Sequence, residues 1–236
     1  MRILSRFWWL SKHGRSAKRR WIHSQYWHFG QQERVKLFLS IARFMQINRP
    51  ITGYYFEFGC NGANTLRMAF RTFRYLFDLH YVGFDSFEGL PEIAEIDKQQ
   101  IWRKGKLAFA EDEYIRLALR SGIPKNRLTT VKGFYDQSLT SELQLKLSPG
   151  KAAVIYIDCD LYKSTVPILE WMIPFLQRGT IVVFDDWFCF HGDPERGERL
   201  AWREFLLRHP KLQFEEFVRT NEAQSFIFIK DASTSQ

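Results

Sequence analysis

Cysteine is scarce in the 236-residue chain: there are three, Cys60, Cys159 and Cys189, and none has C-x-x-C spacing. This odd set argues against a disulfide framework and favours a reduced, cytoplasmic compartment. Long apolar runs are also missing, and no small-residue cleavage site follows the apolar stretch near the N-terminus. The sequence therefore supports neither a transmembrane helix nor a signal peptide.

Motifs of several common enzyme classes are missing as well. The chain has no P-loop, no Ser-His-Asp nucleophile pattern and no G-x-G-x-x-G fingerprint of the dinucleotide-dependent dehydrogenases. Disorder is not the default, because 45% of the residues are hydrophobic and 17% are aromatic. A chain of this length suits one α/β domain with a substantial core.

Acidic residues are absent from residues 1–30, whose seven lysines and arginines account for nearly all of the net charge of +8. We call residues 1–30 the N-terminal arm and expect the folded domain to occupy residues 31–236. The aromatic residues of the arm suit a peripheral contact with an anionic membrane, a nucleic-acid contact, or packing against the domain. Nucleic acid is the least favoured partner, because the domain itself carries little net positive charge. The aromatic residues in question are Phe7, Trp8, Trp9, Trp21 and Trp27.

Two strands joined by a helix organise the second half of the chain. Ala153–Ile157 and Thr180–Phe184 are unbroken apolar runs, which are typical of strands buried on both faces. The connection between them contains a helix opened by Ser164, with Pro167 in its first turn, and is too long for a hairpin. We therefore predict a βαβ unit in which the two strands are parallel neighbours.

Three aspartates follow these strands, Asp158 after the first and Asp185 and Asp186 after the second. Parallel neighbours end about 4.8 Å apart at the edge where open α/β sheets bind ligands, so the three carboxylates should converge. Because they repel one another, either one is protonated or a cation lies among them, and an all-oxygen set suits Mg²⁺. The simpler alternative is that each aspartate only caps a turn or a helix.

An earlier unit has the features of a nucleoside site. Strand Tyr54–Phe58 leads into a turn that contains Gly59 and Gly62, where glycine lets a ligand approach the N–H groups of a helix N-terminus. Strand His80–Phe84 leads into Asp85, which lies 26 residues after Gly59. This is near the spacing at which an acidic side chain binds the ribose hydroxyls of a nucleoside cofactor.

The remaining patterns complete an alternating α/β chain. The long polar connection Glu92–Glu111 predicts a lid or binding loop, with a surface insertion as the simpler alternative. Two apolar runs near the C-terminus predict an antiparallel hairpin. The other predicted helices are Glu33–Ile47, Glu113–Ser121, Gln137–Leu147 and one opened by Asp193 and Pro194, and the other strands are Arg127–Lys132, Gln213–Val218 and Ser225–Ile229.

Four segments together resemble a known family. EFGCNGANT, GFDSFEGLPE, IYIDCDLYKST and GTIVVFDDW resemble the macrocin O-methyltransferase (TylF-like) family of class I S-adenosylmethionine-dependent methyltransferases, over about residues 52–230. The resemblance implies a Rossmann-like α/β fold, with a doubly wound, mostly parallel seven-stranded sheet and a C-terminal antiparallel hairpin. It also implies S-adenosylmethionine and Mg²⁺ as cofactors.

The resemblance further implies roles for single residues. The chain departs from the family at one turn, where the family usually has glycine at the position of Ala63 and this chain has it one residue earlier. The implied cofactor contacts are Glu57 and Gly59 with the methionine moiety, Gly62 in the same turn, Asp85 and Ser86 with the ribose, and Gly133 and Phe134 with the adenine, while Asp158, Asp185 and Asp186 would bind the metal.

The implied activity is Mg²⁺-dependent methyl transfer to a hydroxyl of a sugar, glycan or glycosylated natural product. Such a displacement needs an aligned acceptor and a base, for which Asp158 and His191 are the candidates. Two alternatives stay open: a catechol or small-phenol O-methyltransferase, and a non-catalytic binding protein of methyltransferase-like fold that uses the arm to hold a partner or membrane. The sequence leaves open the acceptor and whether the chain forms a homo-oligomer.

Overall fold

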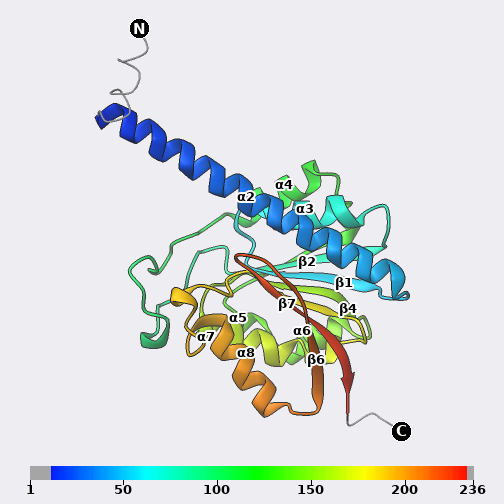
Figure 1. Cartoon of the computed structure of the whole chain (residues 1–236). Coiled ribbons are helices and arrows are strands. Elements are labelled where there is room, and N and C mark those ends of the chain that lie inside the picture. The colour runs from blue at the N-terminus through cyan, green and yellow to red at the C-terminus, as the bar shows by residue number, and fades with distance from the viewer. Residues whose placement is uncertain (1–11, 233–236) are drawn as a thin grey trace.

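The computed structural model describes residues 12–232 and shows a single sheet with helices on both faces (Figure 1). Its seven strands have the order β3-β2-β1-β4-β5-β7-β6. Strands β1 to β5 are parallel, and β7 pairs antiparallel with both β5 and β6. The predicted doubly wound sheet with its C-terminal hairpin is therefore confirmed. The strands are β1 (Gly53–Phe58), β2 (Leu79–Asp85), β3 (Leu128–Lys132), β4 (Ala152–Ile157), β5 (Ile181–Phe184), β6 (Leu212–Arg219) and β7 (Gln224–Asp231).

Each face of the sheet has its own hydrophobic core. Leu37 of α2, Phe70 of α3 and Tyr114 of α4 belong to the core on one face. Ile168 of α7 and Trp202 of α8 belong to the core on the other face. The helices are α2 (Lys12–Ile47), α3 (Asn64–Phe73), α4 (Glu111–Arg120), α5 (Tyr135–Ser138), α6 (Ser141–Leu147), α7 (Tyr162–Trp171) and α8 (Gly197–Arg208).

Strands β4 and β5 explain why apolar runs in the sequence locate the centre of the fold. Every residue of both strands is buried, and from Val154 to Ile157 successive side chains of β4 enter the cores on opposite faces. Ile157 pairs with Phe184 in parallel register, as predicted. The residues that follow, Asp158 and Asp185, consequently leave the sheet at the same edge.

Helix α7 begins at Tyr162, so the predicted start at Ser164 is wrong by two residues and Pro167 lies in the second turn. The cause is a cap from a distant loop. The carboxylate of Asp97 accepts hydrogen bonds from the backbone N–H groups of Tyr162 at 2.7 Å and Lys163 at 3.1 Å. These N–H groups have no partner inside the helix, and the residues near them in sequence do not reveal the cap.

Two other helix predictions are corrected. The predicted helix Gln137–Leu147 is two short helices, because the hydroxyl of Thr140 accepts the N–H of Leu143 at 3.1 Å and caps a new helix. Helix α8 begins at Gly197 rather than at Asp193. Asp193 instead comes directly after a short 3₁₀ turn.

Helix α2 begins much earlier than the predicted start at Glu33. It runs unbroken over Lys12–Ile47, across the expected division at residue 30, and its first part projects away from the sheet (Figure 1). Trp21 and Trp27 are each 58% exposed, so neither is buried against the domain. Within residues 12–232 no helix is long and apolar enough to cross a membrane. The predicted aromatic contacts of Phe7, Trp8 and Trp9 lie outside the described residues.

Candidate active site

A cavity of about 820 Å³ lies at the C-terminal edge of the parallel strands. Its walls come from α2, from the turns after β1 and β3, from the loop after β2 and from the segment after β4. The predicted loop Glu92–Glu111 contributes several wall residues. A cavity of this size suits a cofactor together with a small acceptor. Six predicted site residues line it: Gly59, Asp85, Ser86, Gly133, Phe134 and Asp158.

Gly59 joins the turn after β1 to the end of β4. Its φ is +93°, and a Cβ atom at this position would lie 1.8 Å from the carbonyl oxygen of Asp158. Its N–H donates to the carbonyl oxygen of Phe84 at 3.0 Å. Only glycine accepts both the left-handed backbone and the close approach, so this residue fixes the floor of the cavity.

The carboxylate of Asp85 is held by the backbone before any ligand arrives. It accepts the N–H groups of Cys60 and Phe87, each at 2.7 Å. Burial raises the pKa of Asp85, and these two hydrogen bonds oppose that rise. Each carboxylate oxygen has further acceptor capacity, which suits the vicinal hydroxyls of a ribose. The neighbouring Ser86 hydroxyl donates to the carbonyl of Gly89 at 2.8 Å and therefore also shapes the turn.

Glu57 lies behind the cavity rather than in its lining. Its side chain is 1% exposed and accepts the hydroxyl of Tyr55 at 3.0 Å. Burial raises the pKa of Glu57 to about 8, helped by the nearby charges of Asp85 and Asp185. At neutral pH the buried side chain is therefore mostly protonated and can donate a hydrogen bond.

The departure at Ala63 has a structural consequence. Both Gly62 and Ala63 have positive φ, +67° and +54°, and Ala63 is the residue before α3. A left-handed conformation costs an L-residue about 1–2 kcal/mol. The turn therefore has two left-handed positions but only one glycine, and Ala63 occupies the other position. Asn61 and Asn64 of this turn line the cavity, and sequence reasoning missed both.

Gly133 and Phe134 lie beside the Asp85 end of the cavity. Gly133 has a φ of +137° and donates its N–H to the carbonyl of Asp85 at 2.9 Å. Phe134 precedes α5 and is partly exposed in the cavity wall. The turn that carries Phe134 is thus tied to Asp85, the residue expected to bind the ribose.

Asp158, Asp185 and Asp186 converge as the strand order predicts. One carboxylate oxygen of each lies within 4.8 Å of the others. Burial raises the pKa of Asp158, and repulsion from the other two carboxylates adds to the rise. Asp158 lines the cavity, whereas Asp185 is 4% exposed behind it.

Arg34 of α2 supplies a positive charge to these aspartates, which sequence reasoning missed. Its Nε lies 3.1 Å from Oδ1 of Asp185 and its Nη2 lies 2.5 Å from Oδ2. Tyr156 of β4 also donates its hydroxyl to this carboxylate. Among the described residues, no other lysine or arginine forms an ion pair with the three aspartates. The two partners lie 151 residues apart in the chain, so no local pattern signals the contact.

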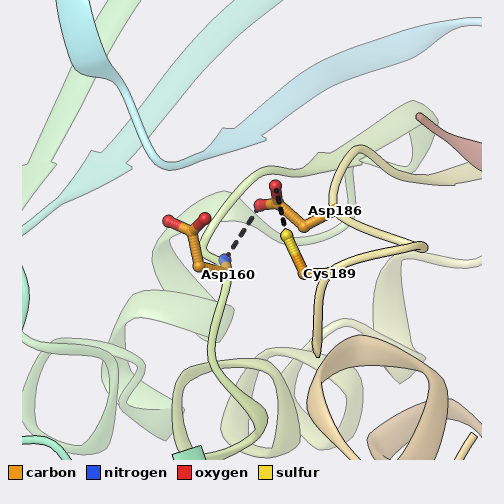
Figure 2. Close-up of side chains that lie close together, drawn as sticks. All are labelled: Asp160, Asp186 and Cys189. Atoms are coloured by element: carbon orange, nitrogen blue, oxygen red, sulfur yellow. Dashed lines mark hydrogen bonds between the residues drawn. The ribbon is translucent and has the colours of Figure 1, made fainter. Parts of the chain in front are cut away.

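A second acidic group shares Asp186 and was also missed. Figure 2 shows the backbone N–H of Asp160 and the thiol of Cys189 both directed at the Asp186 carboxylate, at 3.1 Å and 3.4 Å. Burial and the neighbouring Asp158 raise the pKa of Asp160 to about 7. Glu198 of α8 accepts the N–H of Asp186 at 3.1 Å, and its other oxygen is buried without a partner among the described residues. The sequence signal was the second aspartate of D-C-D.

His191 does not lie with the other predicted site residues. It is exposed, has a φ of +62° in a short turn, and is not among the residues that line the cavity. Of the two candidate bases, only Asp158 lies in the cavity wall.

Comparisons with known proteins identify the family. Residues 56–187, more than half of the chain, match the family described as methyltransferase domain, and the chain belongs to that family. The family match covers the turn after β1, Asp85 and the three aspartates.

One relative is a Streptomyces olivaceus protein named 8-demethyl-8-(2,3-dimethoxy-alpha-L-rhamnosyl)-tetracenomycin-C 4'-O-methyltransferase. It is 30% identical over 115 residues, which are 44% of this chain and only 40% of the relative's length. Two solved structures share the fold. The O-methyltransferase NovP has a TM-score of 0.68 at 20% identity, covering 84% of this chain and 80% of its own. The calicheamicin methyltransferase CalS11 has a TM-score of 0.65 at 23% identity, covering 82% and 77%.

Proposed function

We propose that this protein is an S-adenosylmethionine-dependent O-methyltransferase of the TylF-like kind, acting on a hydroxyl of a sugar or glycosylated acceptor. The observation that supports it most directly is one cavity that Asp85 and Asp158 share. The first carboxylate is held by two backbone N–H groups and keeps acceptor capacity for ribose hydroxyls, and the second belongs to the convergent set Asp158, Asp185 and Asp186. The name of the tetracenomycin relative, which acts on a rhamnosyl-bearing compound, agrees with a sugar-containing acceptor.

Residues at different positions along the cavity would bind different parts of the cofactor. Asp85 would accept the ribose hydroxyls, while Gly133 and Phe134 would flank the adenine. Glu57 would remain protonated behind the turn that holds the methionine moiety. S-adenosylmethionine supplies an electrophilic methyl group, and the protein must hold the acceptor oxygen in line with it.

The three aspartates fit a divalent cation in donor type, since their oxygens lie within 4.8 Å of one another and two of the three have raised pKa values. When bound, Mg²⁺ would orient the acceptor and lower the pKa of its hydroxyl. Asp158, which lines the cavity, is the base that this geometry favours over His191. Arg34 opposes cation binding at this cluster, because its guanidinium already contacts Asp185.

The two alternatives make different demands on the site. A catechol or small-phenol acceptor would use the same carboxylates and differs only in the acceptor. A non-catalytic binding protein has no need of such a cluster, and buried carboxylates are costly to keep without a partner.

Calorimetry tests the cofactor half of the proposal. We expect S-adenosylhomocysteine to bind and NAD to give no heat. Heat with NAD alone would refute the methyltransferase proposal. Mass spectrometry of glycans from cells with and without the gene would then identify the acceptor, and an unmethylated phenol accumulating in place of a glycan would favour the phenol alternative.

A further inference from the structure

The cluster of Asp158, Asp185 and Asp186, the acidic edge of the sheet, already has a positively charged partner within the chain, the guanidinium of Arg34. Arg34 engages both oxygens of Asp185, and Tyr156 donates to the same carboxylate. The side chain of Arg34 is 22% exposed and that of Asp185 is 4% exposed, so the pair is largely shielded from water. Bidentate, charge-assisted hydrogen bonds between arginine and a carboxylate are among the strongest that a carboxylate forms.

A divalent cation bound by all three aspartates needs an oxygen of Asp185. A guanidinium in contact with both oxygens of that carboxylate blocks the approach, and its charge repels a second cation at this range. We propose that Arg34 and a divalent cation are alternative occupants of Asp185, so that cation binding and the contact of α2 with the acidic edge oppose each other. The proposal rests on the metal site proposed above and adds a competitor to it.

The competition reaches the cavity wall through α2. Trp27 and Gln31 precede Arg34 by seven and three residues, so the three side chains share one face of the helix, and all three line the cavity. The following turns of α2 stay anchored, because Leu37, Phe38 and Ile41 are fully buried. Loss of the Arg34 contact should therefore loosen the part of α2 before residue 35 without releasing the whole helix. By linkage, a bound cation must disfavour the Arg34 contact to the same extent that the contact disfavours cation binding.

Direct Mn²⁺ binding, read from the paramagnetic resonance of the free ion, tests the competition without an activity assay. We expect Arg34→Gln to bind Mn²⁺ at least about tenfold more tightly than the wild type, a difference of about 1.4 kcal/mol. Arg20→Gln is the matched control, because Arg20 lies on the same helix, donates to the hydroxyl of Ser16 and is not among the residues that line the cavity. Adding Asp185→Asn to the Arg34→Gln variant should remove the gain.

Hydrogen exchange of the wild type gives a second, independent reading. Saturating Mn²⁺ should speed amide exchange over residues 27–34 and leave residues 37–45 unchanged. Equal Mn²⁺ affinity in wild type and Arg34→Gln, no Mn²⁺ binding in either, or slower exchange over residues 27–34 would each overturn the competition. S-adenosylhomocysteine binding, measured in the same samples, separates this failure from a failure of the proposed function.

The outer part of α2 supports a second inference from different residues. Ile22, Tyr26 and Phe29 are 46%, 55% and 50% exposed and are spaced four and three residues apart, so they form one apolar stripe. Lys18 and Arg19 lie at the outer end of this stripe, and no acidic residue occurs before Glu33. The stripe faces a different side of the helix from Trp27, which lines the cavity.

We infer that the stripe docks on an anionic lipid surface. Aromatic side chains with basic neighbours suit the interface between lipid headgroups and acyl chains, and the absence of acidic residues removes repulsion from that surface. A helix docked in this way lies on the membrane and does not span it.

Vesicle sedimentation tests this inference. We expect the full chain to bind vesicles that contain phosphatidylserine, to ignore pure phosphatidylcholine, and to bind less as salt rises, because salt screens the attraction. Replacing the three stripe residues together by serine should reduce binding at least about tenfold, a loss of about 1.4 kcal/mol. The control replaces Leu145 and Leu207 by serine, since these are 75% and 74% exposed elsewhere on the protein.

Each other occupant of the stripe gives a different outcome. A dimer in sedimentation equilibrium that the serine variant loses, without vesicle binding by the wild type, would assign the stripe to a second copy and overturn the inference. Binding to a DNA oligomer in place of vesicles, or unaltered vesicle binding by the serine variant, would overturn it as well.

Discussion

The two halves of the cavity edge stabilise their carboxylates in different ways. At the β1–β2 half, Asp85 accepts two backbone N–H groups and has no carboxylate partner competing for them. At the β4–β5 half, Asp158, Asp185 and Asp186 crowd together; Arg34 pairs with Asp185, and burial with mutual repulsion raises the pKa of Asp158 and Asp186. A carboxylate that accepts backbone N–H groups is stable as an anion and can accept neutral hydroxyls. Crowded carboxylates repel one another, so they are stable only when one is protonated or a cation lies among them.

The largest effect is expected from a substitution at Gly59, because this residue contacts both halves of the cavity edge. Gly59→Ala should lower the free energy of unfolding by about 4 kcal/mol or more, since the added Cβ meets the backbone of Asp158. Gly105→Ala is the control: its φ is +74° but nothing lies within 4 Å of the new atom, so only about 1 kcal/mol should be lost. Urea unfolding measures both, and equal losses would show that the close approach does not matter.

The crowded half should govern turnover. Asp186→Asn and Asp185→Asn should each reduce the turnover number about 100-fold or more while leaving the affinity for S-adenosylhomocysteine nearly unchanged. Asp158→Asn should be at least as damaging, because this residue would act as both ligand and base. A chelator should mimic the first two variants. Full activity of enzyme shown to be metal-free by elemental analysis would remove the cation from the proposal.

The amide-held half should govern cofactor affinity. Asp85→Ala should weaken S-adenosylhomocysteine binding by about 1.5–3 kcal/mol, because charge-assisted hydrogen bonds to the ribose are lost. Calorimetry measures the change, with Asp186→Asn as the control from the other half. A larger loss of affinity in Asp186→Asn than in Asp85→Ala would reverse the comparison.

Glu57 sharpens the comparison through pH. Its pKa is raised by burial from an ordinary value of 4.5 to about 8, so the stability linked to its protonated form is complete below pH 4.5 and is lost as the pH rises to 8. Between pH 6 and 8 the wild type should lose about 2 kcal/mol more stability than Glu57→Gln, whose amide does not titrate. Urea unfolding at the two pH values tests this, and parallel losses would mean that Glu57 is ionised in the fold.

The smallest expected effect concerns His191. It is exposed and outside the cavity wall, so His191→Gln should change the turnover number less than about twofold at any pH. A loss of one limb of the pH profile of turnover in this variant would restore His191 as the base and show that the turn moves during catalysis.

The sequence by itself determined the sheet and the positions of its acidic edge. Apolar runs located β4 and β5, and their connection required parallel pairing, which placed Asp158 and Asp185 at one edge. The 26-residue spacing from Gly59 placed Asp85 in the same cavity. These features depend on local periodicity and on chain connectivity, both of which can be read along the sequence.

Only the tertiary structure decided which partners these residues meet. The cap of α7 by Asp97, the contact of Arg34 with Asp185 and the left-handed turn at Ala63 leave no periodic signal. The sequence also predicted a helix that begins at Glu33, whereas in the structure α2 is one continuous helix from Lys12. Contacts between segments 65 or 151 residues apart form because the packed sheet brings them together, and no property of either segment alone specifies the other.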